Sequence, residues 1–519
     1  MRVKYSMLNV LAGLGNQLVV TALSFISRTV FISALGVEYL GINALFTNIL
    51  LMLTLAEAGI GASIVYSLYK PVAEEDHEKI NVLMKLYKKA YLVIAIIVLI
   101  LGLSIFPFLG YIVKDTSVDN INLIYFIFLI NTVLPYLYLH KNSFLSVCQK
   151  NYIVTGLYSI SQIVSIGIKI AILYYTQNYI LYLIIDIGVT LLTTLVLVII
   201  VNRMYPFLRD KVTSSLDIET RKTITKNIKA IILQNIGAFI ILSSDNILIA
   251  TFVSVTAVGI YSNYKMLIEI CKTFTNQIFS NLYHSVGNLV AKESINKIYG
   301  IFNSIWLLSF WLHSFFSITL LIVLEPFIVL WIGKEFLMNE GVVLLLLILF
   351  FERGMRNPVT TIKTTSGIFH KDRYVPLCQA VLNLGISIIL VQYIGISGVF
   401  IGTLLSTLVL PFWFTPLIVY RKVFKLPVRI YFQKYLYYFG LVTGTYFITD
   451  FICKFINTVS ILELVLKFLV CIVVPNLIFI VIFYKTDEFK HLYGVAKPLL
   501  ITLLMKIRGG LTIKSTVKE

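Results

Sequence analysis

The stretch YLVIAIIVLILGLSIFPFLGYIV, residues 91–113, decides the fold of this chain because it carries no charge and is long enough to cross a bilayer. About 20 apolar residues, rising roughly 1.5 Å each, span a hydrocarbon core of about 30 Å. Similar uncharged stretches recur along the 519 residues, of which 58% are hydrophobic and 13% are charged. Barrel strands would instead alternate apolar and polar residues over about ten positions. The chain is therefore predicted to be an all-α integral membrane protein.

The positions of these stretches predict about fourteen transmembrane helices, with about twelve or thirteen as the alternative count. Six spans precede a basic, polar connection, six follow it, and two more lie near the C-terminal end. The predicted ranges are 8–33, 39–66, 90–113, 120–147, 153–176, 179–202, 228–252, 257–289, 300–332, 340–368, 375–393, 397–420, 435–453 and 460–483.

Lys and Arg residues are distributed unevenly around these spans, although the net charge is +18. If the N-terminus is cytoplasmic, the outer connections contain only Lys114, Lys334 and Lys454, and all other basic residues outside the spans are on the inner side. This is the positive-inside pattern. It predicts a multi-pass protein of the bacterial cytoplasmic membrane with both termini cytoplasmic, and it accounts for the basic excess without nucleic acid.

An internal repeat relates the first six spans to the second six. VAEEDHEKI at 72–80 corresponds to VAKESINKI at 290–298, and at the same offset Gly41 corresponds to Gly259. Because each copy contains an even number of spans, both run through the membrane in the same direction. Parallel repeats place a substrate site between two halves that rock against each other. The predicted parts are an N-terminal lobe at 1–215, a C-terminal lobe at 216–425, accessory spans at 426–484 and a basic cytoplasmic tail at 485–519.

Several basic residues fall within the predicted spans, where a charge at the bilayer centre costs roughly 2.5 to 3.5 kcal/mol. Such residues usually face a wet cavity, a partner charge or a functional ligand. Guanidinium groups bind phosphate in a bidentate manner and are always charged. A binding site for a substrate diphosphate is therefore predicted, with the candidate residues Arg28, Lys265, Lys272, Arg353, Arg356 and Lys363.

Three of these candidates, Arg353, Arg356 and Lys363, share one face of their helix because they are spaced by three and seven residues. The alternative for this stripe is a structural ion-pair network with Glu352 as partner.

The acids predicted to be buried within the spans are too few to neutralise all the cations, which leaves positive charge for an anion. These acids are Glu57, Asp186, Asp245 and Glu352. Two further cations, Lys169 and Lys467, are interpreted as snorkelling to a membrane interface.

Acidic residues are also the candidates for coupling to H⁺ or Na⁺, or for a gate. They are Glu57, Asp245 and Glu269. Arg28 and Asp245 fall at nearly equivalent places in spans one and seven, each toward the outer end, and could close an outer gate; a structural salt bridge is the alternative. Glu269 could instead neutralise Lys265 or Lys272, which lie four and three residues away on the same helix.

Polar residues crowd the first, second, seventh and eighth spans and could hydrogen-bond a sugar. These candidates are Asn16, Gln17, Asn48, Gln234, Asn235 and Asn263. Hydrogen bonds between helices are the alternative explanation.

The stretches LGVEYLGINALFTNILLMLTLAEAGIGASI (35–64) and VGIYSNYKML (258–267) resemble the polysaccharide repeat-unit flippases of the multidrug/oligosaccharidyl-lipid/polysaccharide exporter superfamily. The resemblance covers at least the first twelve predicted spans. It implies two six-helix lobes around a cationic cavity, in which Arg28 and Lys265 or Lys272 occupy the places that handle a lipid-linked diphosphate. Lys instead of Arg on span eight departs from some members.

The predicted function is that of a flippase, not an enzyme, which moves undecaprenyl-diphosphate-linked oligosaccharides across the membrane by alternating access for cell-surface polysaccharide biosynthesis. Polysaccharide polymerase and other assembly proteins are possible partners. The alternatives are a cation-coupled multidrug exporter of the same superfamily and a membrane polymerase or ligase. No cofactor or metal site is predicted, because the five cysteines are scattered and no phosphate-binding Gly-x-x-x-x-Gly-Lys-Ser/Thr loop occurs.

Overall fold

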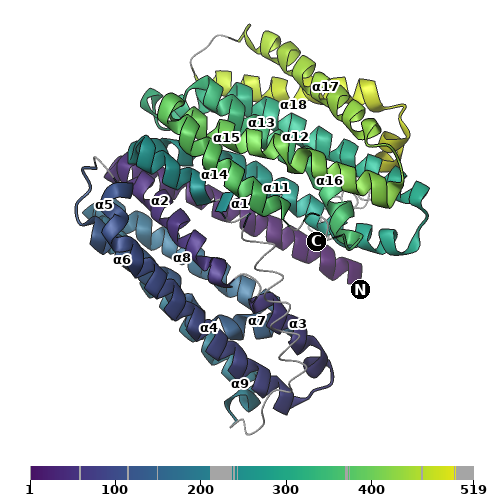
Figure 1. The fold of residues 1–519 in the computed structure, drawn as a ribbon. Helices are drawn as coiled ribbons and strands as arrows, with labels where there is room; N and C mark the ends of the chain where they lie inside the picture. The colour runs from purple at the N-terminus through teal and green to yellow at the C-terminus, as the bar shows by residue number, and fades with distance from the viewer. Residues whose placement is uncertain are drawn as a thin grey trace, which may run out of the picture. The chain divides into compact units, whose positions relative to one another are not determined.

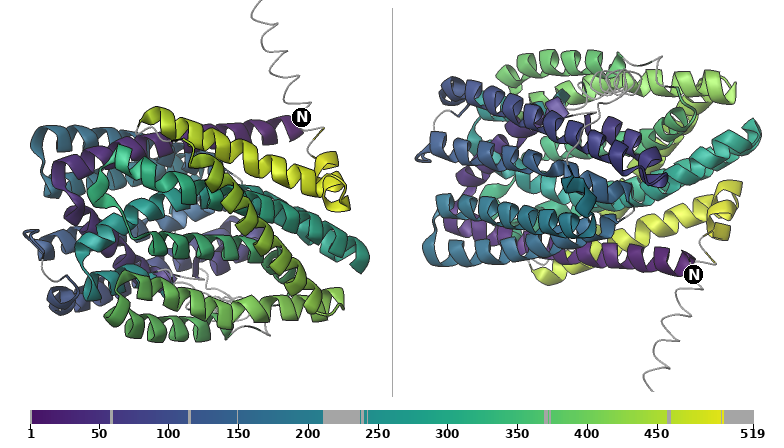
Figure 2. Two further views of the ribbon diagram at one scale, coloured as in Figure 1. Left: turned by 90° about the horizontal axis from the view of Figure 1, so that it is seen from above. Right: turned by 90° about the horizontal axis from the view of Figure 1, so that it is seen from below.

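The computed structural model describes residues 2–57, 60–113, 116–148, 150–210, 237, 240–241, 243–368, 372, 374–456, 460–495 and 497. All regular secondary structure in these ranges is helical, which confirms the predicted all-α class. Figures 1 and 2 show these helices from three directions.

The helices divide into two compact units that are discontinuous in sequence, Met1–Asn263 with Arg373–Ser406 (unit 1) and Tyr264–Asp372 with Thr407–Glu519 (unit 2). Unit 1 contains α1 (Arg2–Leu35), α2 (Val37–Leu53), α3 (Ile60–Ala73), α4 (His77–Ile105), α5 (Leu109–Ile112), α6 (Ile121–Val133), α7 (Leu139–Val147), α8 (Asn151–Thr176), α9 (Tyr179–Met204), α14 (Val375–Ile394) and most of α15 (Ile396–Val409). Unit 2 contains most of α11 (Val255–Lys292), α12 (Ile295–Trp331), α13 (Glu340–Thr365), α16 (Pro411–Val419), α17 (Arg429–Cys453) and α18 (Ile461–Phe483).

Each predicted span overlaps a helix in the described residues. Within the part of the chain that the structure describes, seven helices are long and apolar enough to cross a membrane. The bent pair that includes α6 and α7, with a 44° angle, makes an eighth if it forms one span. The helices α11 and α13 are not among them: α13 carries several charged residues, and α11 is rich in polar residues.

The second predicted span is not a single helix. It consists of α2, the short 3-10 turn η1 (Thr54–Glu57) and α3. A second break separates α15 from α16, where Pro411 lacks the backbone N–H that would continue the hydrogen-bond ladder. Interrupted helices are tolerated in membranes where the freed backbone groups are buried in protein or face a cavity.

A hydrogen-bonded contact joins two predicted outer connections of unit 1. Glu38 at the start of α2 accepts a hydrogen bond from the Ser117 backbone N–H at 2.7 Å and another from the Ser117 hydroxyl. Burial alone would raise the pKa of the Glu38 carboxyl, but the hydrogen bonds from Ser117 and Thr116 hold that pKa below its usual value. The two connections are thus held on the same side of unit 1, as the predicted topology requires.

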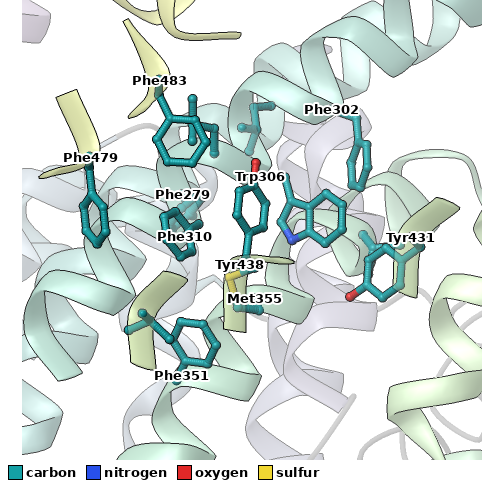
Figure 3. Close-up of a cluster of buried hydrophobic side chains, with 14 of the residues drawn as sticks. Phe279, Phe302, Trp306, Phe310, Phe351, Met355, Tyr431, Tyr438, Phe479 and Phe483 are labelled. Carbon is teal, nitrogen blue, oxygen red and sulfur yellow. The ribbon is translucent and has the colours of Figure 1, made fainter. Parts of the chain in front are cut away.

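The core of unit 2 is a cluster of aromatic side chains that attaches the accessory helices α17 and α18 to α12 (Figure 3). The Trp306 indole and the Tyr431 ring stack in parallel with centroids 4.6 Å apart, and Phe310 stacks on Tyr438 at 4.4 Å. Such pairs contribute about 0.5–1.5 kcal/mol each beyond the burial of their area. The accessory pair is therefore packed into the unit rather than loosely appended.

The two compact units do not follow the predicted lobe boundaries at residues 215 and 425. Helices α14 and α15 cluster with the first nine helices, and α17 and α18 cluster with α12 and α13. The assignment of lobes from the repeat stays a prediction.

Candidate functional site

Arg28 lies on α1 in unit 1 and reaches toward α11. Its Nε donates a hydrogen bond to Asn263 Oδ1 at 2.9 Å, and its Nη2 donates to the Ser262 hydroxyl. One turn along α1, the Phe31 ring makes edge-on contacts with Tyr179 and Tyr182 of α9, at 5.7 and 5.3 Å. This packing holds α1 against α9 and thereby positions the guanidinium.

The described hydrogen-bond partners of Arg28 are neutral. Asn263 is fully buried, Ser262 is 8% exposed, and neither carries a charge. An arginine so placed keeps its full positive charge in a region of low dielectric, where its attraction for an anion is strong. The predicted gate between Arg28 and Asp245 stays a prediction.

A second group of charges in unit 1 was not predicted. The Lys169 ammonium on α8 forms an ion pair with the Asp186 carboxylate on α9 and lies 4.3 Å from the centroid of the Tyr182 ring. Asp186 also accepts a hydrogen bond from the Ser165 hydroxyl at 3.1 Å. The Lys169 side chain, 14% exposed, is thus held between helices by a carboxylate. Its snorkelling to a membrane interface stays a prediction.

The Lys169–Asp186 pair faces a cavity of about 90 Å³ between α2, α6, α8 and α9. The side chains of Asn43 and Asn131 also line it. Three or four polar groups around a space of this size are what a bound water requires. The pair therefore contributes to a polar interior of unit 1.

In unit 2, the predicted cationic stripe on α13 is largely occupied by ion pairs. Arg356 Nε and Nη2 donate to the two carboxylate oxygens of Glu352 at 2.7 and 3.2 Å, and Glu352 is 3% exposed. Lys363 pairs with Asp372. Arg353 is exposed, in contrast to the other two. Arg356 therefore forms the ion pair with Glu352 that was the predicted alternative to phosphate binding.

The Arg356–Glu352 pair lies beside α17. The rings of Tyr431 and Tyr435 are close enough for their hydroxyls to interact electrostatically with both charged groups. A bidentate pair buried against a neighbouring helix fixes the approach of that helix through its geometry.

Two further cations in unit 2 are paired within their own helices. Lys272 Nζ lies 2.5 Å from Glu269 Oε1, so Glu269 neutralises Lys272, one of the two partners considered. Lys467 Nζ lies 2.6 Å from Glu463 Oε1, and the Lys467 side chain is 19% exposed. Its snorkelling to a membrane interface stays a prediction. Lys265 on α11 is half-buried.

Glu57 closes the 3-10 turn that interrupts the second span. Its Oε1 accepts a hydrogen bond from the Tyr91 hydroxyl at 3.3 Å, and Tyr136 is its second hydrogen-bonding partner. Tyr87 donates to the Gly61 carbonyl at 2.5 Å in the same cluster. These described partners are neutral, so the carboxylate can accept a proton or a cation without first breaking an ion pair.

The predicted sugar-contact residues divide into two groups. Asn263 is engaged with Arg28, and the Asn48 amide donates to the Ala44 carbonyl of its own helix at 2.7 Å. The remaining candidates lie outside the described residues or have side chains outside them: Asn16, Gln17, Gln234 and Asn235.

The sequence did not reveal Ser262, Asp186 or Asp372 as partners of the cations, although each could have been sought. Ser262 directly precedes a candidate residue, and Asp186 lies within a predicted span. Asp372 falls in a short connection outside the predicted spans. The surplus of positive charge is accordingly smaller than predicted.

Comparisons with known proteins agree with this architecture. The family model described as polysaccharide biosynthesis protein matches residues 7–283. A search of curated protein sequences found no significant match.

Three solved structures illustrate the shared fold. A structure titled lipid II flippase MurJ, inward closed conformation, has a TM-score of 0.62 and 15% identity, and the alignment covers 91% of this chain and 98% of that one. An inward-facing multidrug resistance MATE family transporter of the MOP superfamily has a TM-score of 0.58 and 14% identity, with 75% and 91% covered. A mutant of the Vibrio cholerae MATE transporter VcmN has a TM-score of 0.53 and 14% identity, with 79% and 94% covered.

These likenesses confirm the predicted all-α membrane fold, and the helices with their apolar surfaces confirm a multi-pass membrane protein. The family match covers more than half of the chain and includes α1, Arg28 and Asn263. The chain belongs to the polysaccharide biosynthesis protein family.

Proposed function

We propose that this protein is a flippase that moves undecaprenyl-diphosphate-linked oligosaccharides from the cytoplasmic to the outer leaflet by alternating access. The observation that carries the proposal is the Arg28 guanidinium, which lies inside a predicted span with the neutral partners Asn263 and Ser262. A bilayer-embedded guanidinium that no described carboxylate neutralises is suited to a diphosphate.

Two comparisons support this choice over the multidrug exporter. The family that the chain belongs to is described by polysaccharide biosynthesis, and the MurJ structure, titled a lipid II flippase, covers nearly the whole chain. The shared fold alone does not separate the two functions, because the MATE transporter also matches. The charge and surroundings of Arg28 favour an anionic substrate over a cationic drug.

The other candidate cations differ in how readily they could contribute. Arg356 and Lys363 would have to leave Glu352 and Asp372 before they could bind a phosphate. Breaking a buried pair by removing one partner costs roughly 3–5 kcal/mol, which is more than one phosphate contact would offset. We therefore rank Arg28 first.

Ion coupling is proposed at Glu57 because its described partners are neutral tyrosines. Glu269, by contrast, is already paired with Lys272. In proteoliposomes, Glu57→Gln should remove the acceleration of transport by an imposed H⁺ or Na⁺ gradient and leave slow, gradient-independent exchange. Equal acceleration of both proteins would move the coupling to Asp245 or to another acid.

The proposed function is tested by leaflet exposure of a fluorescent lipid-diphosphate oligosaccharide in proteoliposomes. Arg28→Ala should slow exposure by a factor of about ten or more, since a charge-assisted hydrogen bond to a phosphate contributes roughly 1.5–3 kcal/mol. Lys297→Ala is the matched control, because Lys297 is 57% exposed and paired with Glu293 outside the spans. If the unaltered protein moves no substrate above protein-free liposomes under either gradient, the flippase proposal is wrong.

A further inference from the structure

A second group of cations lies at the end of unit 1 that is predicted to face the cytoplasm. Lys141 is the third residue of α7, Lys88 lies in the first half of α4, and Arg209 ends the 3-10 turn η4 (Pro206–Arg209) after α9. Lys88 and Arg209 are the charged groups that act on the Lys141 ammonium. Three elements thus direct like charges to one place.

The cluster is held in place by contacts that do not neutralise it. Lys141 Nζ donates to Asn202 Oδ1 at 2.6 Å, which ties α7 to α9. The Asn81 amide donates to the Phe207 carbonyl at 2.7 Å, and the His77 ring stacks on the Phe207 ring with centroids 4.0 Å apart. These bonds fix η4, and with it Arg209, against the start of α4.

Nothing among the described residues neutralises this group. The ion pairs found in the described residues include none with Lys88, Lys141 or Arg209. The adjacent His140 side chain is 5% exposed, and no described group hydrogen-bonds to its Nδ1. Lys141 and Lys88 also act electrostatically on this imidazole. Like charges at a partly buried site repel one another unless an anion lies between them.

We propose that Lys88, Lys141 and Arg209 form a binding site for the phosphate group of an anionic membrane lipid. Basic pockets between helices on the cytoplasmic side of a membrane are typical sites for anionic lipid headgroups. The cations come from three different helical elements, so a bound phosphate would tie these elements together. The site is separate from Arg28, and the inference does not depend on the proposed transport.

Native mass spectrometry of the full-length protein in detergent tests the proposal, with phosphatidylglycerol as the first ligand. The double variant Lys88→Gln/Arg209→Gln changes two exposed side chains and should weaken phosphatidylglycerol retention roughly tenfold or more. Lys141→Gln should weaken it as well. Lys88→Arg/Arg209→Lys keeps both charges and should retain the lipid, and Lys297→Gln is the control for an exposed, paired lysine on the same predicted side.

Competition identifies the source of the phosphate. The site would be assigned to the lipid-linked substrate if undecaprenyl diphosphate displaces phosphatidylglycerol from the unaltered protein. In the double variant, undecaprenyl diphosphate should then be retained no better than phosphatidylglycerol. Retention of phosphatidylglycerol against undecaprenyl diphosphate and inorganic phosphate would assign it to bulk phospholipid. Equal phosphatidylglycerol retention by the unaltered protein, the double variant and Lys141→Gln would overturn the proposal.

Discussion

Gly41 of α2 and Gly259 of α11 lie at a reciprocal backbone contact. A methyl group added to Gly41 would overlap the Val255 carbonyl, and one added to Gly259 would overlap the Val37 carbonyl. Val37 and Val255 are related by the same sequence offset as the two glycines. The two copies of the repeat therefore meet through equivalent residues, as the two sides of a two-fold interface do.

Substitution of either glycine by alanine should therefore separate the two helices. Gly41→Ala and Gly259→Ala should each lower the free energy of unfolding by about 1–3 kcal/mol, because the obstructing atoms belong to the backbone and cannot rotate away. Thermal unfolding in detergent measures the loss. Gly444→Ala on α17 is the control, since its added methyl group meets open space; a loss of the same size there would show that the effect is not specific to the contact.

Much of this fold follows from the sequence because apolar length and the distribution of Lys and Arg report directly on the bilayer. The repeat also predicts that Gly41 and Gly259 occupy corresponding positions. The breaks at Glu57 and Pro411 were missed, because an interrupted span has nearly the same hydropathy as a continuous one. The partners of the buried cations were missed for a different reason: Lys169 with Asp186 and Lys363 with Asp372 depend on which helices pack together.

The neutral surroundings of Arg28 lead to a prediction in which charge is added rather than removed. Asn263→Asp would place a carboxylate 2.9 Å from the Arg28 Nε and neutralise it. Leaflet exposure of the lipid-diphosphate oligosaccharide should fall by a factor of about ten or more, while the new ion pair keeps the fold stable. Asn263→Ala removes the hydrogen bond to Arg28 without adding a charge, and so measures the effect of the lost hydrogen bond alone. Wild-type transport by Asn263→Asp would show that the Arg28 charge is not used.

The Arg356–Glu352 pair is predicted to be structural. Arg356→Met should destabilise the protein by about 3–5 kcal/mol because it leaves the buried Glu352 carboxylate without its partner. The double variant Arg356→Met/Glu352→Leu should recover most of that loss and retain transport. Chemical or thermal unfolding and the leaflet-exposure assay are measured on the same preparations. A double variant that is folded but inactive would instead return Arg356 to the substrate site.

The attachment of the accessory helices should depend on pH through Glu488. Lys434 Nζ on α17 lies 2.9 Å from Glu488 Oε1, 3.1 Å from Asn303 Oδ1 on α12 and 5.7 Å from the centroid of the Trp306 indole. Burial alone would raise the pKa of the Glu488 carboxyl, but the bond with Lys434 lowers it below 4.5.

Because the folded-state pKa is lowered, this stabilisation is complete above pH 4.5 and is lost as the pH falls through the folded-state value. Glu488→Gln should therefore unfold at a lower temperature than the unaltered protein at pH 7. The free energy of unfolding should be lower by about 1 kcal/mol. The two melting curves should converge in acid. A constant difference down to the lowest pH at which both proteins stay folded would exclude ionisation of Glu488 as the cause.

The interruption of the second span leads to a prediction about coupling between two neighbours of Glu57. The Tyr91 hydroxyl lies 3.3 Å from Glu57 Oε1, and a methyl group on Gly61 would come 2.7 Å from that hydroxyl. Gly61→Ala should displace the Tyr91 ring from Glu57 and lower the free energy of unfolding by about 1–3 kcal/mol. Tyr91→Phe removes both the hydrogen bond and the obstructing oxygen, at a cost of about 1.5–3 kcal/mol for a bond to a charged group.

In the double variant Gly61→Ala/Tyr91→Phe the added methyl group no longer meets a hydroxyl, so the combined loss should be smaller than the sum of the two single losses. Unfolding of all four proteins under the same conditions gives the interaction free energy, which should be at least about 0.5 kcal/mol for residues in contact. Gly110→Ala is the control in unit 1, because its added methyl group meets open space. It measures the change in the free energy of unfolding that a glycine substitution causes without an obstructing atom. If the two single losses in the free energy of unfolding are strictly additive, Gly61 does not set the position of Tyr91. The position of Glu57 at the break would then be set by the backbone of η1 alone.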